Sequence, residues 1–162
     1  MARSNKIVLI SLLGFALCHI FLPAGAYALD QIITIPSESP GGIELDIPKG
    51  EYMVRIEGGA ASLFYPINPN YRWLIGISVG AGVEGGQDEA NLGTLYFEPD
   101  PPVNNQAEAE AQAVKAVKDD LPGTSLELDL REDKKVRFWV SDFDYTDNSG
   151  MVKLRISSLI PQ

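Results

Sequence analysis

Cysteine and histidine are almost absent from this chain, which has one of each, Cys18 and His19, among its 162 residues. Beyond residue 28 there is neither, which excludes disulfides, thiol chemistry, zinc sites of the usual kind and histidine-based acid–base catalysis there. No SxxK motif supports a serine–lysine nucleophile, and no carboxylate lies in an apolar setting that would raise its pKa for glycoside hydrolysis. We therefore expect a protein that is not an enzyme.

Basic residues are also scarce. The chain has 13 Lys and Arg against 22 Asp and Glu, and residues 1–28 contain two of the basic residues and none of the acidic ones. Residues 29–162 thus carry 11 basic and 22 acidic side chains, a formal net charge of −11. Such a domain is not expected to bind nucleic acid or an anionic membrane through its overall charge, whereas it would attract cations.

The N-terminal segment has the pattern of a signal peptide. A basic start precedes an apolar run over residues 7–22, and Ala-Tyr-Ala at 26–28 fits a signal peptidase site. The alternative, a membrane anchor, is disfavoured because the run is shorter than the roughly 20 residues of a spanning helix and has no basic flank behind it. We expect cleavage near Leu29, a secreted or periplasmic protein, and no membrane insertion after cleavage.

Residues 29–162 have the spacing of short strands separated by glycine- and proline-rich turns. We predict a single domain: an all-β, antiparallel two-sheet β-sandwich of the jelly-roll, galactose-binding-like kind. The run at 43–47 is expected to form a hairpin with 51–57, and the run at 134–140 to pair with 151–157. Residues 105–120, rich in Ala, Glu, Gln and Lys and ended by a Pro-Gly pair, predict one surface helix.

An unusual number of oxygen-bearing side chains lies between the last two predicted strands, in the stretch DFDYTDNSG. Calcium prefers six to eight oxygen ligands, and closely spaced carboxylates repel one another unless a cation or water intervenes. The stretch does not fit an EF-hand loop, because the central glycine is absent and its twelfth residue is Lys153. The alternative is a solvated loop whose Asp and Asn side chains only hold turns.

Two segments together resemble the bacterial calcium-dependent galactophilic lectins (lectin A type) and the wider galactose-binding-like β-sandwich domains. They are GEYMVRIEGGAAS at 50–62 and VRFWVSDFDYTDNSGMVKLRI at 136–156. The resemblance implies one calcium ion on which two sugar hydroxyls complete the coordination. It also implies a backbone carbonyl ligand from the region Ala61 to Tyr65. The side chains that it implies as metal ligands are those of Asp142, Thr146, Asp147 and Asn148. Asp144, another oxygen donor of the same stretch, is a candidate ligand from the residues alone.

The chain departs from the lectin pattern in several ways. Two residues are missing between Thr146 and the pair at 147 and 148, and Asp147 replaces the first asparagine. The chain also lacks the sugar-contacting histidine of the family, and it has a predicted helix at 105–120 for which the lectin pattern has no equivalent. The resemblance therefore supports the fold and the metal more than it supports galactose.

Aromatic side chains could supply a stacking surface for the apolar face of a sugar. Tyr65, Trp73 and Trp139 are the candidates for ligand binding. Trp139 is out of phase with the apolar residues of its strand and is expected to face outward. For each of them, packing in the core or on the sheet is the alternative.

The expected function is calcium-dependent carbohydrate binding without catalysis, with carbohydrate as the partner and an oligomer possible. The alternative is a structural or protein-interaction module of the cell envelope. In that case calcium, if bound, would only stabilise the C-terminal hairpin.

Overall fold

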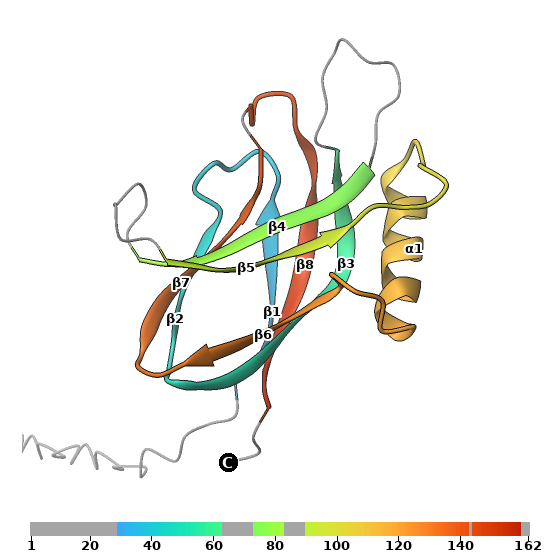
Figure 1. Cartoon of the computed structure of the whole chain (residues 1–162). Helices are drawn as coiled ribbons and strands as arrows, with labels where there is room; N and C mark the ends of the chain where they lie inside the picture. Colours follow the sequence, from blue (N-terminus) through green and yellow to red (C-terminus); the bar gives the residue numbers. More distant parts are fainter. Residues whose placement is uncertain (1–28, 63–72, 83–89, 143, 160–162) are drawn as a thin grey trace, which may run out of the picture.

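The structure is a computed structural model that describes residues 29–62, 73–82, 90–142 and 144–159. In these ranges the chain is mostly antiparallel β-sheet with one helix (Figure 1). The elements are β1 (Asp30–Pro36), β2 (Ile43–Ile47), β3 (Gly50–Ser62), β4 (Trp73–Ala81), β5 (Ala90–Phe97), α1 (Gln106–Lys118), β6 (Ser125–Leu130), β7 (Lys134–Val140) and β8 (Ser149–Ser158). The predicted signal peptide and Tyr65 lie outside the described residues.

The strands form two groups that are joined at one point. One group has the order β1-β8-β3-β6 and the other the order β2-β7-β4-β5. β3 links them, because Ala61 and Ser62 pair with Leu74 and Trp73 of β4. The result is one eight-stranded, nearly closed, barrel-like sheet. The predicted antiparallel β class and the helix are confirmed, and the finer jelly-roll assignment stays a prediction.

The interior between the two groups is filled by the side chains that alternate inward along each strand. Val152, Leu154 and Ile156 of β8 are fully buried, as their period-two spacing predicts. In β7, Val136, Phe138 and Val140 are buried while Trp139 between them is partly exposed, which confirms the predicted outward phase of Trp139. At about 25 cal/mol per Å² of apolar surface, this burial supplies the main favourable free energy of folding.

Both expected strand pairings are wrong. β2 pairs with β7 and not with β3, and β8 pairs with β1 and β3 and not with β7. The short connections do not act as hairpin turns because β3 spans 13 residues and takes β8 and β6 as its partners instead. The acidic stretch is therefore not a hairpin loop, since it carries the chain from one group of strands to the other.

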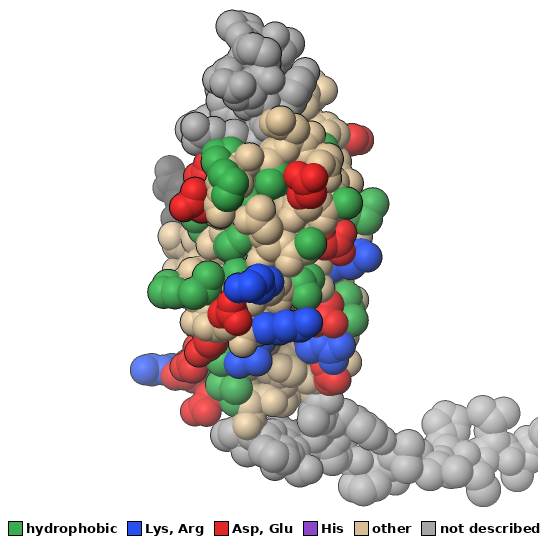
Figure 2. Space-filling model, turned by 90° about the vertical axis from the view of Figure 1, so that its right-hand side faces the viewer, with side chains coloured by type: hydrophobic (Ala, Val, Ile, Leu, Met, Phe, Trp, Pro, Cys, Tyr) green, Lys and Arg blue, Asp and Glu red, His purple; other side chains and the backbone are tan. Residues whose placement is uncertain are grey.

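Helix α1 lies on β3 through small residues. Its N-cap is Asn105, whose Oδ1 accepts a hydrogen bond from the Glu108 amide at 2.9 Å. Ala109, Ala113 and Ala116 are buried, and the helix packs beside β3 (Figure 1). Figure 2 shows this side of the molecule, where positive and negative side chains are interspersed with scattered hydrophobic ones. The helix is a surface element, as predicted.

The strand ends that surround the candidate site meet at one end of the molecule. β1, β3 and β7 end there and β4 and β8 begin there, whereas β1 begins and β8 ends at the opposite end (Figure 1). We refer to this part as the loop end. Within the described ranges, no helix is long and apolar enough to cross a membrane.

Candidate functional site

The acidic loop, residues 141–148, connects β7 to β8 at the loop end (Figure 1). Its start is anchored because the Ser141 amide donates to the Gly76 carbonyl of β4 at 3.1 Å. Its middle is anchored by Tyr145, which packs against the core while its hydroxyl donates to the Val140 carbonyl at 2.7 Å. The loop thus has an apolar attachment that its acidic composition did not suggest.

The tip of the acidic loop is a turn closed by its own side chains. Asp144 Oδ1 accepts hydrogen bonds from the Thr146 amide at 3.0 Å and from Thr146 Oγ1 at 2.6 Å. The hydroxyl bond, and then the amide bond, lower the pKa of Asp144 below its ordinary value. Both residues are exposed. Their hydrogen bonds are those expected of a solvated loop whose side chains hold a turn, which was the alternative to a metal site.

Asn148 differs from the other predicted ligands because it is buried, with 5% of its surface exposed. Its Nδ2 donates to the Ser37 carbonyl at 3.0 Å, whereas its Oδ1 is buried and has no hydrogen-bond partner among the described residues. A carbonyl oxygen only accepts, so Nδ2 must face Ser37 and Oδ1 must face another direction. Leaving such an acceptor unsatisfied costs about 1–3 kcal/mol, a cost that a water molecule or a cation would remove.

Ser37, at the start of the connection between β1 and β2, binds the beginning of β8. Its amide and its hydroxyl both donate to the Gly150 carbonyl, at 3.2 and 2.9 Å. Gly150 has a φ of +93°, and a Cβ there would lie 2.5 Å from the Ala60 carbonyl oxygen and 2.8 Å from the Trp73 ring. Only glycine therefore fits at this position.

The end of β3 lies directly beside the acidic loop. Ser62 is paired with Ser149 on one side and with Trp73 on the other. The structure therefore brings the first residues of the predicted carbonyl region, Ala61 and Ser62, next to the start of β8. Trp73 is partly buried against the core and against Gly150. Part of its ring therefore packs in the protein, which was the alternative to stacking on a sugar.

Trp139 lies on the outer face of β7 beneath the connection between β1 and β2. The guanidinium of Arg137 stacks over its ring, 4.7 Å from the centroid. Arg137 itself is 7% exposed and donates from Nε to the Gly41 carbonyl at 2.8 Å and from Nη2 to the Pro40 carbonyl at 2.7 Å. One face of Trp139 is thus covered by Arg137.

Ser37 and Arg137 were not identified from the sequence. An arginine at an outward position of a strand is typical of a solvated face, and Ser37 lies in an ordinary turn cluster. One feature of the sequence could have indicated the contact. Arg137 and Trp139 are two residues apart on a predicted strand, so their side chains are expected on the same side of the sheet.

The predicted calcium ligands are of the chemical types that the ion prefers. All five lie in one loop, Asp142 and Asp147 are half-buried, and Asn148 holds a buried oxygen without a partner in the described residues. In the described ranges no three acidic side chains are grouped so that they could hold a metal ion, so carboxylates alone would not make the site. Amide and backbone oxygens would have to complete it, as calcium commonly allows.

Comparison with known proteins adds no relative to this picture. A scan against protein-family models gives no match, and searches of the curated proteins and of the solved structures give none either.

Proposed function

We propose that the protein is a non-catalytic, calcium-dependent carbohydrate-binding domain. The observation that carries the proposal is the buried Asn148 Oδ1, which lacks a partner among the described residues and belongs to a loop with three aspartates. A hard cation would satisfy this oxygen and relieve the repulsion between the carboxylates at the same time.

Asp142, Asp147 and Asn148 would hold the ion, helped by Asp144 or Thr146 and by a backbone carbonyl of the 61–65 region. The pairing of Ser62 with Ser149 supports the last contribution, because it keeps the end of β3 beside the loop. Bound calcium would offer coordination positions for neighbouring hydroxyl groups of a sugar. The exposed part of Trp73, next to Gly150, is the aromatic surface best situated for the apolar face of that sugar.

The finer fold assignment belongs to the same proposal. Two groups of four strands around one core are compatible with a galactose-binding-like jelly roll. The signal-peptide pattern of residues 1–28 supports a secreted or periplasmic location. Oligomerisation would raise the avidity for a glycan that carries several copies of the sugar.

A second function is favoured by the depth of Asn148. A buried ligand oxygen on a residue that is only 5% exposed suits an ion that braces the connection between the two groups of strands without contacting a sugar. In that case the domain would be a structural or protein-interaction module of the envelope, and calcium would stabilise the acidic loop only.

A glycan array with the purified protein distinguishes these functions. We expect binding to a set of glycans in millimolar calcium, its loss in EDTA, and its recovery when calcium is returned. The Asn148→Ala variant should bind no glycan in either buffer, whereas Ser39→Ala, in a neighbouring loop, should behave as the wild type. Calcium binding without any glycan signal would favour the bracing function, and glycan binding that resists EDTA would contradict the proposed mechanism.

A further inference from the structure

The orientation of the Asn148 amide is determined by a residue outside the acidic loop. Nδ2 donates to the Ser37 carbonyl at 3.0 Å, and Ser37 is fully buried. Rotating the amide by half a turn would bring Oδ1 against that carbonyl oxygen, where two acceptors would repel each other. Ser37 therefore fixes which end of the amide is available to a ligand.

Ser37 is itself held from two directions. On one side, its amide and hydroxyl donate to the Gly150 carbonyl, two residues beyond Asn148. On the other side, the chain continues to Pro40 and Gly41, whose carbonyls accept the two hydrogen bonds from Arg137 at 2.7 and 2.8 Å. Moving Ser37 away from Asn148 would break or strain these contacts.

Arg137 is suited to clamp this segment. Its guanidinium is almost buried, lies on the Trp139 ring and makes charge-assisted bonds to two backbone carbonyls. The segment follows β7 closely as well, because a Cβ on Gly42, which has a φ of +62°, would lie 2.1 Å from the Phe138 carbonyl oxygen. The clamp and the close contact together hold residues 40–42 against β7, while the bonds to Gly150 hold Ser37 against β8.

We propose that Ser37 and Arg137 are positioning residues for the calcium site. Neither would contact the ion. They hold the Asn148 amide with its oxygen turned away from the β1–β2 connection and thereby preorganise one ligand. This inference rests on the proposed function, since it requires that calcium binds at Asn148. Groups that orient a metal ligand typically contribute a factor of about 10–100 to the affinity for the metal.

The test is the calcium dissociation constant, measured by calorimetry with calcium chloride at a temperature far below the unfolding midpoint of every variant. Arg137→Met removes the clamp but leaves every predicted ligand, and it should weaken calcium binding about 10-fold or more. Arg137→Lys keeps a positive charge that reaches one carbonyl at most, and it should fall between the wild type and Arg137→Met. Ser37→Ala removes only one of the two bonds to Gly150 and should weaken binding less than Arg137→Met.

Two control variants are available in the same chain. Arg131→Met changes an exposed arginine in the connection between β6 and β7, and Ser39→Ala changes a serine in the same connection as Ser37. Both should retain the dissociation constant of the wild type. A nitrogen–proton spectrum gives an independent readout, because the Asn148 side-chain amide protons should exchange faster with solvent in Arg137→Met than in either control.

The outcomes separate this inference from the proposed function. If the wild type gives no calcium heat, the proposed function fails and the inference fails with it. If the wild type binds calcium and both Arg137 variants keep its affinity and its amide protection, the proposed function stands and the positioning role is overturned. If Arg137→Met proves unstable, the intermediate affinity expected for Arg137→Lys still decides.

Discussion

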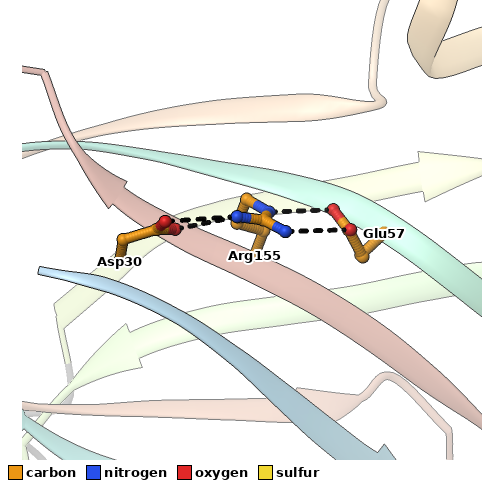
Figure 3. A network of polar contacts seen from close by, with 3 residues as sticks. All are labelled: Asp30, Glu57 and Arg155. Atoms are coloured by element: carbon orange, nitrogen blue, oxygen red, sulfur yellow. Dashed lines mark hydrogen bonds and ion pairs between the residues drawn. The ribbon is translucent and has the colours of Figure 1, made fainter.

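The β1 and β8 strands carry a polar cluster at each of their two ends, and the clusters differ in almost every respect. At the loop end, Ser37, Asn148 and Gly150 form a neutral cluster in which Ser37 and Asn148 are buried. Toward the opposite end, Arg155 lies between Asp30 and Glu57 with nitrogen–oxygen distances of 3.1–3.2 Å (Figure 3). All three of these charged side chains remain well exposed to solvent.

The difference shows that neither the charge of a polar cluster nor its number of hydrogen bonds indicates how much the cluster contributes to stability. The charged cluster makes four hydrogen bonds, but water and salt screen exposed ion pairs, which typically contribute little to stability. The neutral cluster makes fewer bonds, yet breaking one of them leaves a buried polar atom without water to replace its partner. Among the described residues, Asn148 Oδ1 is the only buried side-chain nitrogen or oxygen atom without a hydrogen-bond partner, and it also belongs to the neutral cluster. The proposed function therefore belongs to the loop end, and we expect only a modest structural role for the charged cluster.

The largest expected effect is that of Gly150→Ala. The added Cβ would face the Ala60 carbonyl oxygen at 2.5 Å and the Trp73 ring at 2.8 Å, and the φ of +93° would strain any other residue. We expect a loss of about 3 kcal/mol or more in the free energy of unfolding, measured by urea denaturation. Ser149→Ala, at the adjacent exposed position, should change this free energy by less than about 0.5 kcal/mol. A stable Gly150→Ala protein would show that the contact between β3, β4 and β8 is looser than described.

Asn148→Ala should come next. Without calcium, the variant leaves the Ser37 carbonyl without the Nδ2 donor but also removes the buried, unpartnered Oδ1. These two effects oppose each other, so we expect the free energy of unfolding to fall by less than about 1–3 kcal/mol. With calcium at a hundredfold excess over its dissociation constant, the wild type should gain about 2.7 kcal/mol and the variant nothing. Urea denaturation in EDTA and in calcium measures both quantities. An equal calcium gain in both proteins would remove Asn148 from the ligand set.

Ser37→Ala isolates one bond of the buried cluster. It removes the hydroxyl donor to the Gly150 carbonyl but keeps the amide donor, so we expect a loss of about 1 kcal/mol. This loss should be insensitive to salt because no charge is involved. A strong dependence of the loss on sodium chloride concentration would contradict the assignment of the cluster as neutral and buried.

Glu57→Gln should have the smallest effect, although it breaks an ion pair. The hydrogen bond from Arg155, and then its charge, lower the pKa of Glu57 below its usual value of 4.5. Because the folded-state pKa is lowered, the contribution of Glu57 is fully present above the unfolded value and is lost as the pH falls through the folded value. The wild type and Glu57→Gln should thus differ slightly at pH 7 in low salt and converge in acid, measured by thermal unfolding across pH.

Glu51→Gln, on the same strand and exposed, is the matched control for Glu57→Gln. The comparison between the two clusters would be reversed if Glu57→Gln cost more stability than Ser37→Ala at physiological salt.

Much of the fold could be predicted from local patterns. Period-two alternation identified the buried faces of β3, β7 and β8, because side-chain direction along a strand depends only on position. The composition and stop signals at 105–120 predicted α1 for the same local reason.

Strand partners could not be predicted in this way. A short connection suggests a hairpin, but the chain gains more by pairing β3 with β8 over most of its length and by closing the two groups around one core. Such a choice depends on the total apolar surface buried, which no local window contains.

The candidate site shows the same division. The acidic loop and its oxygen ligands were visible in the sequence because they are contiguous. The Ser37 carbonyl accepts a hydrogen bond from the Asn148 side chain, 111 residues away in the sequence. Arg137 donates to the carbonyls of Gly41 and Pro40, which are 96 and 97 residues away. Contacts over such separations are created by the strand order and have no signature in the residues themselves.

The measurement that tests the account most directly is a calorimetric titration of the purified wild-type protein with calcium, with Asn148→Ala alongside. The account predicts a single saturable site in the wild type and no binding heat in the variant. No heat in the wild type, or equal heat in both proteins, would contradict a calcium site at Asn148 and the carbohydrate-binding function built on it.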